Sequence, residues 1–183
     1  MKTIVLAGGC FWGVQKFFDQ FPGIKSVVGY ANGSIPNPTY EQVCRGSGHT
    51  EAVEIFYEEP IKAVQILAAY FVIIDPTSLN RQGNDIGINY RTGVYSNDPQ
   101  ILELARLMLK DIEEKIHKKV VVETGSLNHF YEAEDYHQNY LLHNPNGYCH
   151  LPASIMRGHS LPTIEQILKA YPSLSRLPED QLI

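Results

Sequence analysis

The stretch "TIVLAGGCFWG", residues 3–13, joins a short apolar run to two glycines, a cysteine and an aromatic pair. Residues 3–7 predict a buried strand, because a short apolar run bounded by glycines is typical of one. After Cys10, apolar residues recur at helical spacing, at Phe11, Val14, Phe17, Phe18 and Phe21. Pro22 and Gly23 then end the run. Cys10 is therefore predicted to lie at a turn from a strand into a helix.

An export signal is a competing interpretation of this start, because "LAGGC" is similar to the lipid-attachment site of bacterial lipoproteins. Such a signal needs a positively charged start and an apolar stretch of roughly 7 to 15 residues. Here only residues 4–7 separate Lys2 and Thr3 from the glycines. We therefore expect the stretch to belong to the folded protein.

Composition limits the class of protein. The chain has 183 residues, of which 44% are hydrophobic and 19% charged, as in a single globular domain with a substantial core. A net charge of −5 with scattered lysines and arginines argues against a nucleic-acid partner. The longest apolar run, residues 63–74, is shorter than the roughly 18 residues that a membrane-spanning helix requires. We expect a soluble monomer without membrane or nucleic-acid partners.

The three cysteines, Cys10, Cys44 and Cys149, are too few and too widely spaced for a disulfide framework. We therefore expect a reducing cytoplasm as the compartment. There a thiol is kept for reactivity, for binding a metal, or as a small buried hydrophobe.

Periodicity and turn residues predict the remaining elements. Strands are expected over residues 24–33, 50–59, 91–96 and 119–124, and helices over residues 60–74, 99–116, 132–143 and 163–171. Asp98 and Pro99 are the expected N-cap and first helical residue of the helix over 99–116. Residues 36–49 and 75–90 are polar and rich in turn formers, so we expect long irregular connections there.

Strands and helices alternate, but the elements are short and the loops long. This favours a single α+β domain over a doubly wound parallel sheet. We expect a small mixed β-sheet flanked by helices, with a ferredoxin-like core and long functional loops.

The predicted position of Cys10 has a chemical consequence. Unpaired N–H groups and the positive end of the helix dipole favour a thiolate, so its pKa is expected below the usual value of roughly 8.5. Phe11 and Trp12 would wall a small apolar pocket beside it. The alternative is an inert thiol with both aromatic rings in the core.

Two further clusters carry polar groups. In "NPTYEQVCRGSGHTEAV" (37–53), Tyr40 and Glu51 lie on a loop and a strand edge, and an acid facing an apolar pocket would have a raised pKa suited to donating a proton. A solvated carboxylate is the alternative. "RQGNDIGINYR" (81–91) gathers Asp85, Asn89 and Tyr90, whose alternative role is turn formation.

Taken together, these motifs closely resemble the A-type peptide methionine sulfoxide reductases. "GCFWG" (9–13) is the signature of that family. "GY", "PNPTYEQVC", "GHTEAV", "QGNDIGINYR" and "NPNGYC" follow in the family's order with similar spacing, over roughly residues 3–149. We therefore expect a catalytic reductase domain over residues 1–149 and a C-terminal tail over 150–183, packed on this domain or extending from it.

The resemblance implies thiol-dependent reduction of the S epimer of methionine sulfoxide, free or in proteins, as a repair of oxidative damage. Cys10 would attack the sulfoxide sulfur and Glu51 would protonate the oxygen. The family's other site residues match here as well: Tyr40 and Tyr90 as hydroxyl donors, Asp85 as a supporting carboxylate, and Phe11 and Trp12 as walls around the substrate methyl group. No cofactor and no metal are implied.

The resemblance also implies how the thiol is regenerated. Cys149 matches the resolving cysteine, which would condense with a sulfenic acid on Cys10 to form a disulfide. Many members carry a further recycling cysteine a few residues later, but residues 150–160 contain none. We therefore expect thioredoxin or a similar dithiol to reduce a Cys10–Cys149 disulfide directly. Cys44 matches a cysteine without a catalytic role, expected to be a packed loop thiol.

Two other classes of function compete with this hypothesis. The first is a metal-binding or binding-only module, because seven histidines accompany the three cysteines, but no CxxC or HxxxH spacing occurs. Another thiol oxidoreductase, such as a peroxide reductase, would use the same reactive Cys10.

Overall fold

The computed structural model describes residues 1–157 and 160–183. The sheet strands are β1 (Lys2–Ala7), β2 (Lys25–Ala31), β3 (Thr50–Tyr57), β6 (Gly93–Tyr95), β7 (Glu123–Gly125) and β8 (Phe130–Glu132), and β4 (Arg81–Gln82) pairs with β5 (Asp85–Ile86). The helices are α1 (Phe11–Asp19), α2 (Tyr40–Cys44), α3 (Ala63–Ile73), α4 (Pro99–Ile116), α5 (Tyr140–His143) and α6 (Ile164–Ala170). Short 3₁₀ turns are η1 (Ile88–Tyr90), η2 (Asp135–His137), η3 (Ala153–Met156), η4 (Pro172–Arg176) and η5 (Glu179–Leu182).

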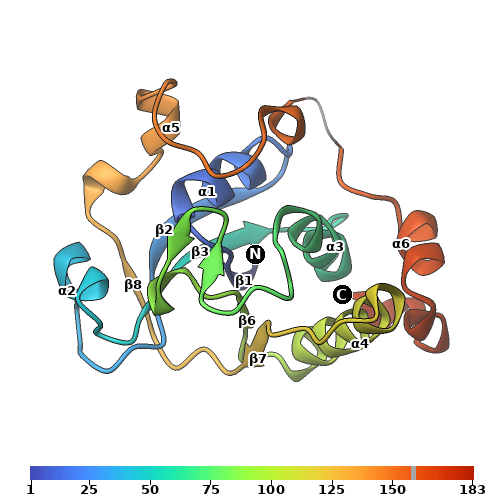
Figure 1. Ribbon diagram of the computed structural model, residues 1–183. Helices are drawn as coiled ribbons and strands as arrows, with labels where there is room; N and C mark the ends of the chain where they lie inside the picture. The colour runs from blue at the N-terminus through green and yellow to red at the C-terminus, as the bar shows by residue number, and fades with distance from the viewer. Residues whose placement is uncertain (158–159) are drawn as a thin grey trace.

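The main sheet has six strands in the order β7-β6-β1-β3-β2-β8 (Figure 1). β1 pairs antiparallel with both β3 and β6, β3 pairs antiparallel with β2, and β6 pairs parallel with β7. The prediction of a small mixed sheet flanked by helices is therefore confirmed. β1 and β3 lie at its centre, so the residues that follow β1 and those that begin β3 are brought together.

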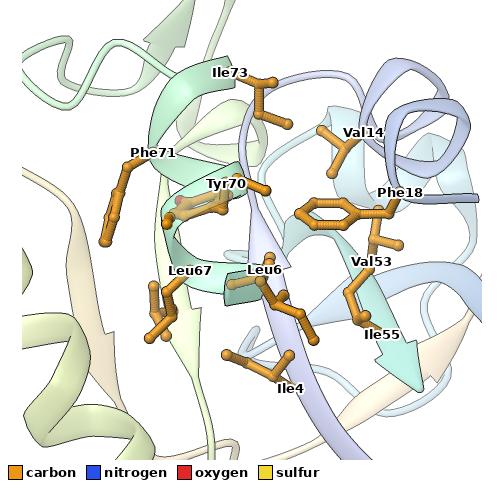
Figure 2. Close-up of a cluster of buried hydrophobic side chains, with 14 of the residues drawn as sticks. Ile4, Leu6, Val14, Phe18, Val53, Ile55, Leu67, Tyr70, Phe71 and Ile73 are labelled. Atoms are coloured by element: carbon orange, nitrogen blue, oxygen red, sulfur yellow. The ribbon is translucent and has the colours of Figure 1, made fainter. Parts of the chain in front are cut away.

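The main core lies between the sheet and the helices. Because side chains alternate along a strand, Ile4 and Leu6 of β1 point to the helices, where Phe18 of α1 and Leu67 of α3 pack against them (Figure 2). Burying one such side chain contributes about 1.5–3 kcal/mol. A smaller cluster covers the opposite face of the sheet; its members are Val5, Ala7, Ala31, Ala52 and Tyr95, with Leu127 and Phe130 against them.

The predicted helix over 99–116 is confirmed at both ends. The Asp98 side chain accepts a hydrogen bond from the Gln100 N–H at 2.9 Å, and Pro99 is the first helical residue. His117 ends the helix in a left-handed conformation at φ 53°.

Both long connections contain regular structure that composition did not predict. Residues 36–49 include α2, which begins with a capping box: the Gln42 N–H donates to Thr39 Oγ1 at 3.2 Å and the Thr39 N–H to Gln42 Oε1 at 2.9 Å. Residues 75–90 include the β4–β5 hairpin and η1. The strand predicted over 119–124 is confirmed only at its end, because β7 starts at Glu123.

The helix predicted over residues 132–143 is confirmed only at its end, as α5; β8 and η2 occupy the rest of the segment. The Gln138 side chain hydrogen-bonds the N–H and the carbonyl of Val28 in β2, at 3.0 and 2.9 Å, and Asn139 takes a positive φ of 54°. These bonds to a distant strand hold the segment in a shape that a continuous helix cannot adopt.

The C-terminal residues pack on the helical side of the molecule. Leu151, Ile167, Leu174 and Leu182 are buried in the main core. α6 lies against α3 and η4 against α4, where Asp111 accepts hydrogen bonds from the Ser173 N–H and hydroxyl. In the described part of the chain, every helix is too short or too polar to span a bilayer.

Candidate active site

Cys10 lies between β1 and α1 and is the N-cap residue of α1, as the sequence predicts. Its side chain is only 6% exposed. The preceding Gly9 has φ +82°, and a side chain there would collide with Gln82 and come within 3.1 Å of His150. The turn therefore admits only glycine, and it packs closely against Gln82 and His150.

The expected fall in the pKa of Cys10 is wrong. Burial raises the pKa of the thiol, and the charge of Glu51 raises it further. The Trp12 N–H at the start of α1 hydrogen-bonds the sulfur and lowers the pKa, but this contribution is smaller. Removal from water thus outweighs the helix terminus, and Cys10 is a protonated thiol in the free protein.

Glu51 is a buried acid in β3, 1% exposed. Burial raises its pKa well above 4.5, and the charge of Asp85 adds to this effect. The Phe11 N–H hydrogen-bonds the carboxyl group, whereas Oε2 has no partner among residues 1–157 and 160–183. Glu51 is therefore not a solvated carboxylate, and its burial favours the protonated acid.

Tyr40 in α2 and Tyr90 in η1 bring two phenols to the same place. Burial raises the pKa of both hydroxyls, and in each case the charge of Glu51 is the next largest cause. The charges of Asp85 and Cys10 also raise the pKa of Tyr90. The raised pKa values keep both phenols protonated and able to donate hydrogen bonds, and the Tyr40 hydroxyl donates to the Cys44 thiol.

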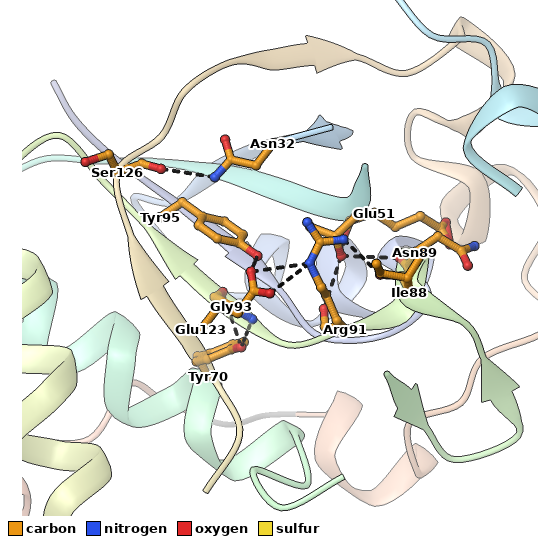
Figure 3. A network of polar contacts seen from close by, with 11 residues as sticks. Asn32, Glu51, Tyr70, Ile88, Asn89, Arg91, Gly93, Tyr95, Glu123 and Ser126 are labelled. Carbon is orange, nitrogen blue, oxygen red and sulfur yellow. Dashed lines mark hydrogen bonds and ion pairs between the residues drawn. The ribbon is translucent and has the colours of Figure 1, made fainter. Parts of the chain in front are cut away.

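A polar network fixes the segment that carries Tyr90 (Figure 3). The Thr50 hydroxyl donates to the carbonyl oxygens of Asn89 and Arg91 at 3.3 and 3.1 Å. The buried Arg91 guanidinium donates to the Ile88 carbonyl at 2.9 Å and pairs with Glu123 at 3.2 Å. η1 is thereby tied to the start of β3, where Glu51 lies.

Phe11 and Trp12 occupy different environments. Phe11 is fully buried, with its ring 5.8 Å from Tyr30 and 5.2 Å from His137. Trp12 is half-buried and stacks on Tyr140 at 3.8 Å between ring centres, and its indole N–H donates to His137 Nδ1 at 3.1 Å. The Tyr40 ring lies 4.6 Å from His137. The aromatic groups thus form one connected wall beside Cys10.

Cys149 is brought to the first turn of α1. A Cβ added at Gly13 would lie 3.1 Å from Cys149 Sγ. The Tyr148 hydroxyl donates to Asp85 at 3.1 Å, which ties this segment to β5. All three cysteines are free thiols, and Cys44 is exposed on α2, so the expectation of a packed loop thiol is wrong.

Sequence reasoning missed two residues that support the site. The Glu134 carboxylate accepts hydrogen bonds from the Tyr30 hydroxyl at 2.8 Å and from the Tyr40 N–H at 3.1 Å. His137 is buried and holds the Trp12 indole. Both lie in the segment that was predicted as a plain helix, where nothing in the periodicity sets them apart.

The groups gathered here are a buried thiol, a buried carboxyl group with a raised pKa and two phenols with raised pKa values. At such a site, a thiol sulfur can attack an atom of the substrate while the acid protonates the oxygen that leaves that atom. Within the described ranges, no three His, Cys, Asp or Glu residues are placed to hold a metal ion.

Comparison with known proteins gives concordant results. The family model for peptide methionine sulfoxide reductase matches residues 2–166. The peptide methionine sulfoxide reductase MsrA of Lachnoclostridium phytofermentans is 50% identical over 153 residues, covering 82% of this chain and 92% of that protein. Two solved structures are similar. Reduced Mxr1 from Saccharomyces cerevisiae has a TM-score of 0.75 and 33% sequence identity, and the match covers 81% of this chain and 88% of that one. Methionine sulfoxide reductase A of Corynebacterium diphtheriae has a TM-score of 0.73 and 35% sequence identity, and the match covers 81% of this chain and 77% of that one.

Proposed function

This chain belongs to the peptide methionine sulfoxide reductase family, and from this premise we propose that it reduces the S epimer of methionine sulfoxide, free or within proteins, through a cysteine sulfenic acid. The observation that carries the proposal is the buried acid Glu51 beside the Cys10 thiol. A sulfoxide oxygen leaves only once it is protonated, and Glu51 holds the proton for it.

In the first step, Cys10 Sγ attacks the sulfoxide sulfur while Glu51 protonates the oxygen. The Cys10 proton passes to the Glu51 carboxylate. The hydroxyl then moves from the substrate sulfur to Cys10 Sγ as the bond between the two sulfurs breaks, which leaves methionine and a sulfenic acid on Cys10. The raised pKa of the thiol fits this order, because loss of the Glu51 proton to the substrate creates the base that takes the Cys10 proton.

The other site residues orient the sulfoxide. Tyr40 and Tyr90 donate hydrogen bonds to its oxygen without adding charge, supported by their raised pKa values and by their proximity to Glu51. Asp85 acts as a second carboxylate, which helps to keep Glu51 protonated. Phe11 and Trp12 flank the substrate methyl group; of the two, the half-buried Trp12 has the surface to contact it.

In the second step, Cys149 condenses with the sulfenic acid to form a disulfide and water. The position of its sulfur above Gly13, in the first turn of α1, supports this role. A dithiol such as thioredoxin then reduces the disulfide; the yeast relative Mxr1 has been solved in complex with Trx2. The need for such a donor favours a reducing cytoplasm as the compartment.

We extend the proposal to the architecture. A ferredoxin-like core is supported by the antiparallel strand order β6-β1-β3-β2 and by the succession β1-α1-β2-β3-α3-β6, into which α2 and the segment from β4 to η1 are inserted. Residues 1–149 carry every catalytic group named above, and residues 150–183 form a tail packed on the same domain, as a monomer.

The test is a single turnover of reduced protein with excess methionine S-sulfoxide peptide and no reductant. We expect about one methionine per chain and two thiols lost, with the disulfide mapping to Cys10 and Cys149. Cys149→Ser should form methionine but lose one thiol. Cys44→Ser is the matched control: its hydroxyl can still accept the hydrogen bond from Tyr40, and it should form one methionine and lose two thiols. Absence of methionine would refute the proposed function.

A further inference from the structure

His150, the residue after Cys149, has a nitrogen without a defined role. Its Nε2 lies 3.1 Å from the Gly8 carbonyl oxygen, at the end of the loop that leads to Cys10. Its Nδ1 is buried and has no hydrogen-bond partner in the described part of the chain. An uncharged buried nitrogen that is left unpaired is costly, so it calls for a functional explanation.

The contact with Gly8 determines the tautomer. A backbone carbonyl only accepts hydrogen bonds, so Nε2 must carry the proton that is donated to it. Nδ1 then presents a lone pair. Burial lowers the pKa of the ring, whereas Asp85 and the Gly8 contact raise it by less, so the imidazole is neutral and able to accept a proton.

The ring lies beside the resolving thiol. The position that a Cβ at Gly13 would take is 3.1 Å from Cys149 Sγ and 3.3 Å from His150 Nδ1. Both groups therefore cover the same spot on the first turn of α1, directly after Cys10. The titratable groups that face the ring are Asp85, whose charge raises its pKa, and the Cys149 thiol over Gly13.

We propose that His150 is the general base of the second step, accepting the proton of the Cys149 thiol as it attacks Cys10. The inference rests on the proposed function. Cys149 Sγ bonds to Cys10 Sγ, the S–O bond of the sulfenic acid breaks, and Nδ1 takes the thiol proton. The imidazolium then gives this proton to the departing hydroxide, so that water leaves and the ring is neutral again. No further reactant is consumed.

The test follows both steps of one turnover by rapid quench, with methionine measured for the first and the Cys10–Cys149 disulfide for the second. His150→Gln is the informative variant, because its amide N–H can still donate to Gly8 while the base is lost. We expect disulfide formation about 100-fold slower at pH 7, with dimedone trapping the accumulated sulfenic acid.

Added imidazole should restore the rate of disulfide formation in this variant, and so should a pH raised toward the usual thiol pKa of about 8.5. His143→Gln, an exposed histidine on α5, should match wild type.

Two results would overturn the proposal. One is wild-type disulfide formation in His150→Gln. The other is slow disulfide formation that neither imidazole nor higher pH restores, since His150 would then only position the segment. Failure of the proposed function is distinguishable, because the wild-type protein would then form no methionine at all.

Discussion

Cys10 and Glu51 are both buried, and a negative charge on Glu51 opposes a negative charge on Cys10. Burial is the largest cause of the raised pKa in both cases. Burial therefore favours the protonated form of both groups in the free protein. When a substrate oxygen takes the proton of Glu51, the carboxylate that remains can accept the proton of Cys10. Reactivity thus arises when the sulfoxide binds, and the resting thiol is protected from non-specific oxidation because thiolates are the oxidisable form.

Glu51→Gln tests the acid at this scale. The amide keeps the shape of the side chain but has no proton to give, so kcat/KM should fall by about 100-fold or more. In the wild-type protein, the protonated acid is the active form and its pKa lies well above 4.5. The rate should therefore persist above pH 4.5 and fall as pH rises through the raised pKa of Glu51. Profiles of kcat/KM against pH check this: an unchanged high-pH limb in the variant would exclude Glu51 as the acid.

At the scale of elements, α2 is a five-residue helix whose position depends on its first turn. The Thr39 capping box starts it, and Glu134 holds the Tyr40 N–H from the other side. A helix this short has little intrinsic stability, so the cap and the carboxylate determine where the Tyr40 ring lies.

Thr39→Ala should therefore affect catalysis more than folding. Loss of the cap costs about 1 kcal/mol of local stability, and a displaced Tyr40 should lower kcat/KM by about tenfold, while Thr39→Ser should retain activity. Asp98→Ala is the matched control: it removes a cap of the same kind from α4. It should lower the free energy of unfolding by about 1 kcal/mol without changing kcat/KM. Equal loss of activity in both alanine variants would contradict a specific role of α2.

At the scale of the whole molecule, the helical side of the sheet is completed by the C-terminal residues. Leu174 in η4 is fully buried, and the Asp111 carboxylate of α4 binds Ser173 next to it. This distant segment therefore stabilises α4, which in turn covers the sheet that positions Cys10 and Glu51.

Leu174→Ala should lower the free energy of unfolding by about 2–5 kcal/mol, through lost burial and the cavity that remains. Arg176→Ala, at an exposed position two residues later, should change it by less than about 0.5 kcal/mol. Urea denaturation of both variants measures the difference. A small effect of Leu174→Ala would show that the C-terminal residues are dispensable for the core.

Much of this architecture follows from patterns between near neighbours in the chain. The turn at Cys10 and the helix over Pro99–Ile116 were both predictable, because periodicity, glycine and capping residues act over a few positions. The motifs also indicated the residues that meet at the site. α2 and the hairpin in the long loops were not predicted, since their composition resembles that of irregular connections.

Only the tertiary structure decided the chemical state of the groups at the site. A helix N-terminus next to Cys10 is visible in the sequence and favours a thiolate, but the burial that raises its pKa comes from segments far away in the chain. For the same reason, the break near Gln138 and the free Nδ1 of His150 depend on partners in β2 and beside Gly8. Local order is encoded by neighbours in sequence, whereas desolvation and long-range hydrogen bonds depend on which residues the fold places together.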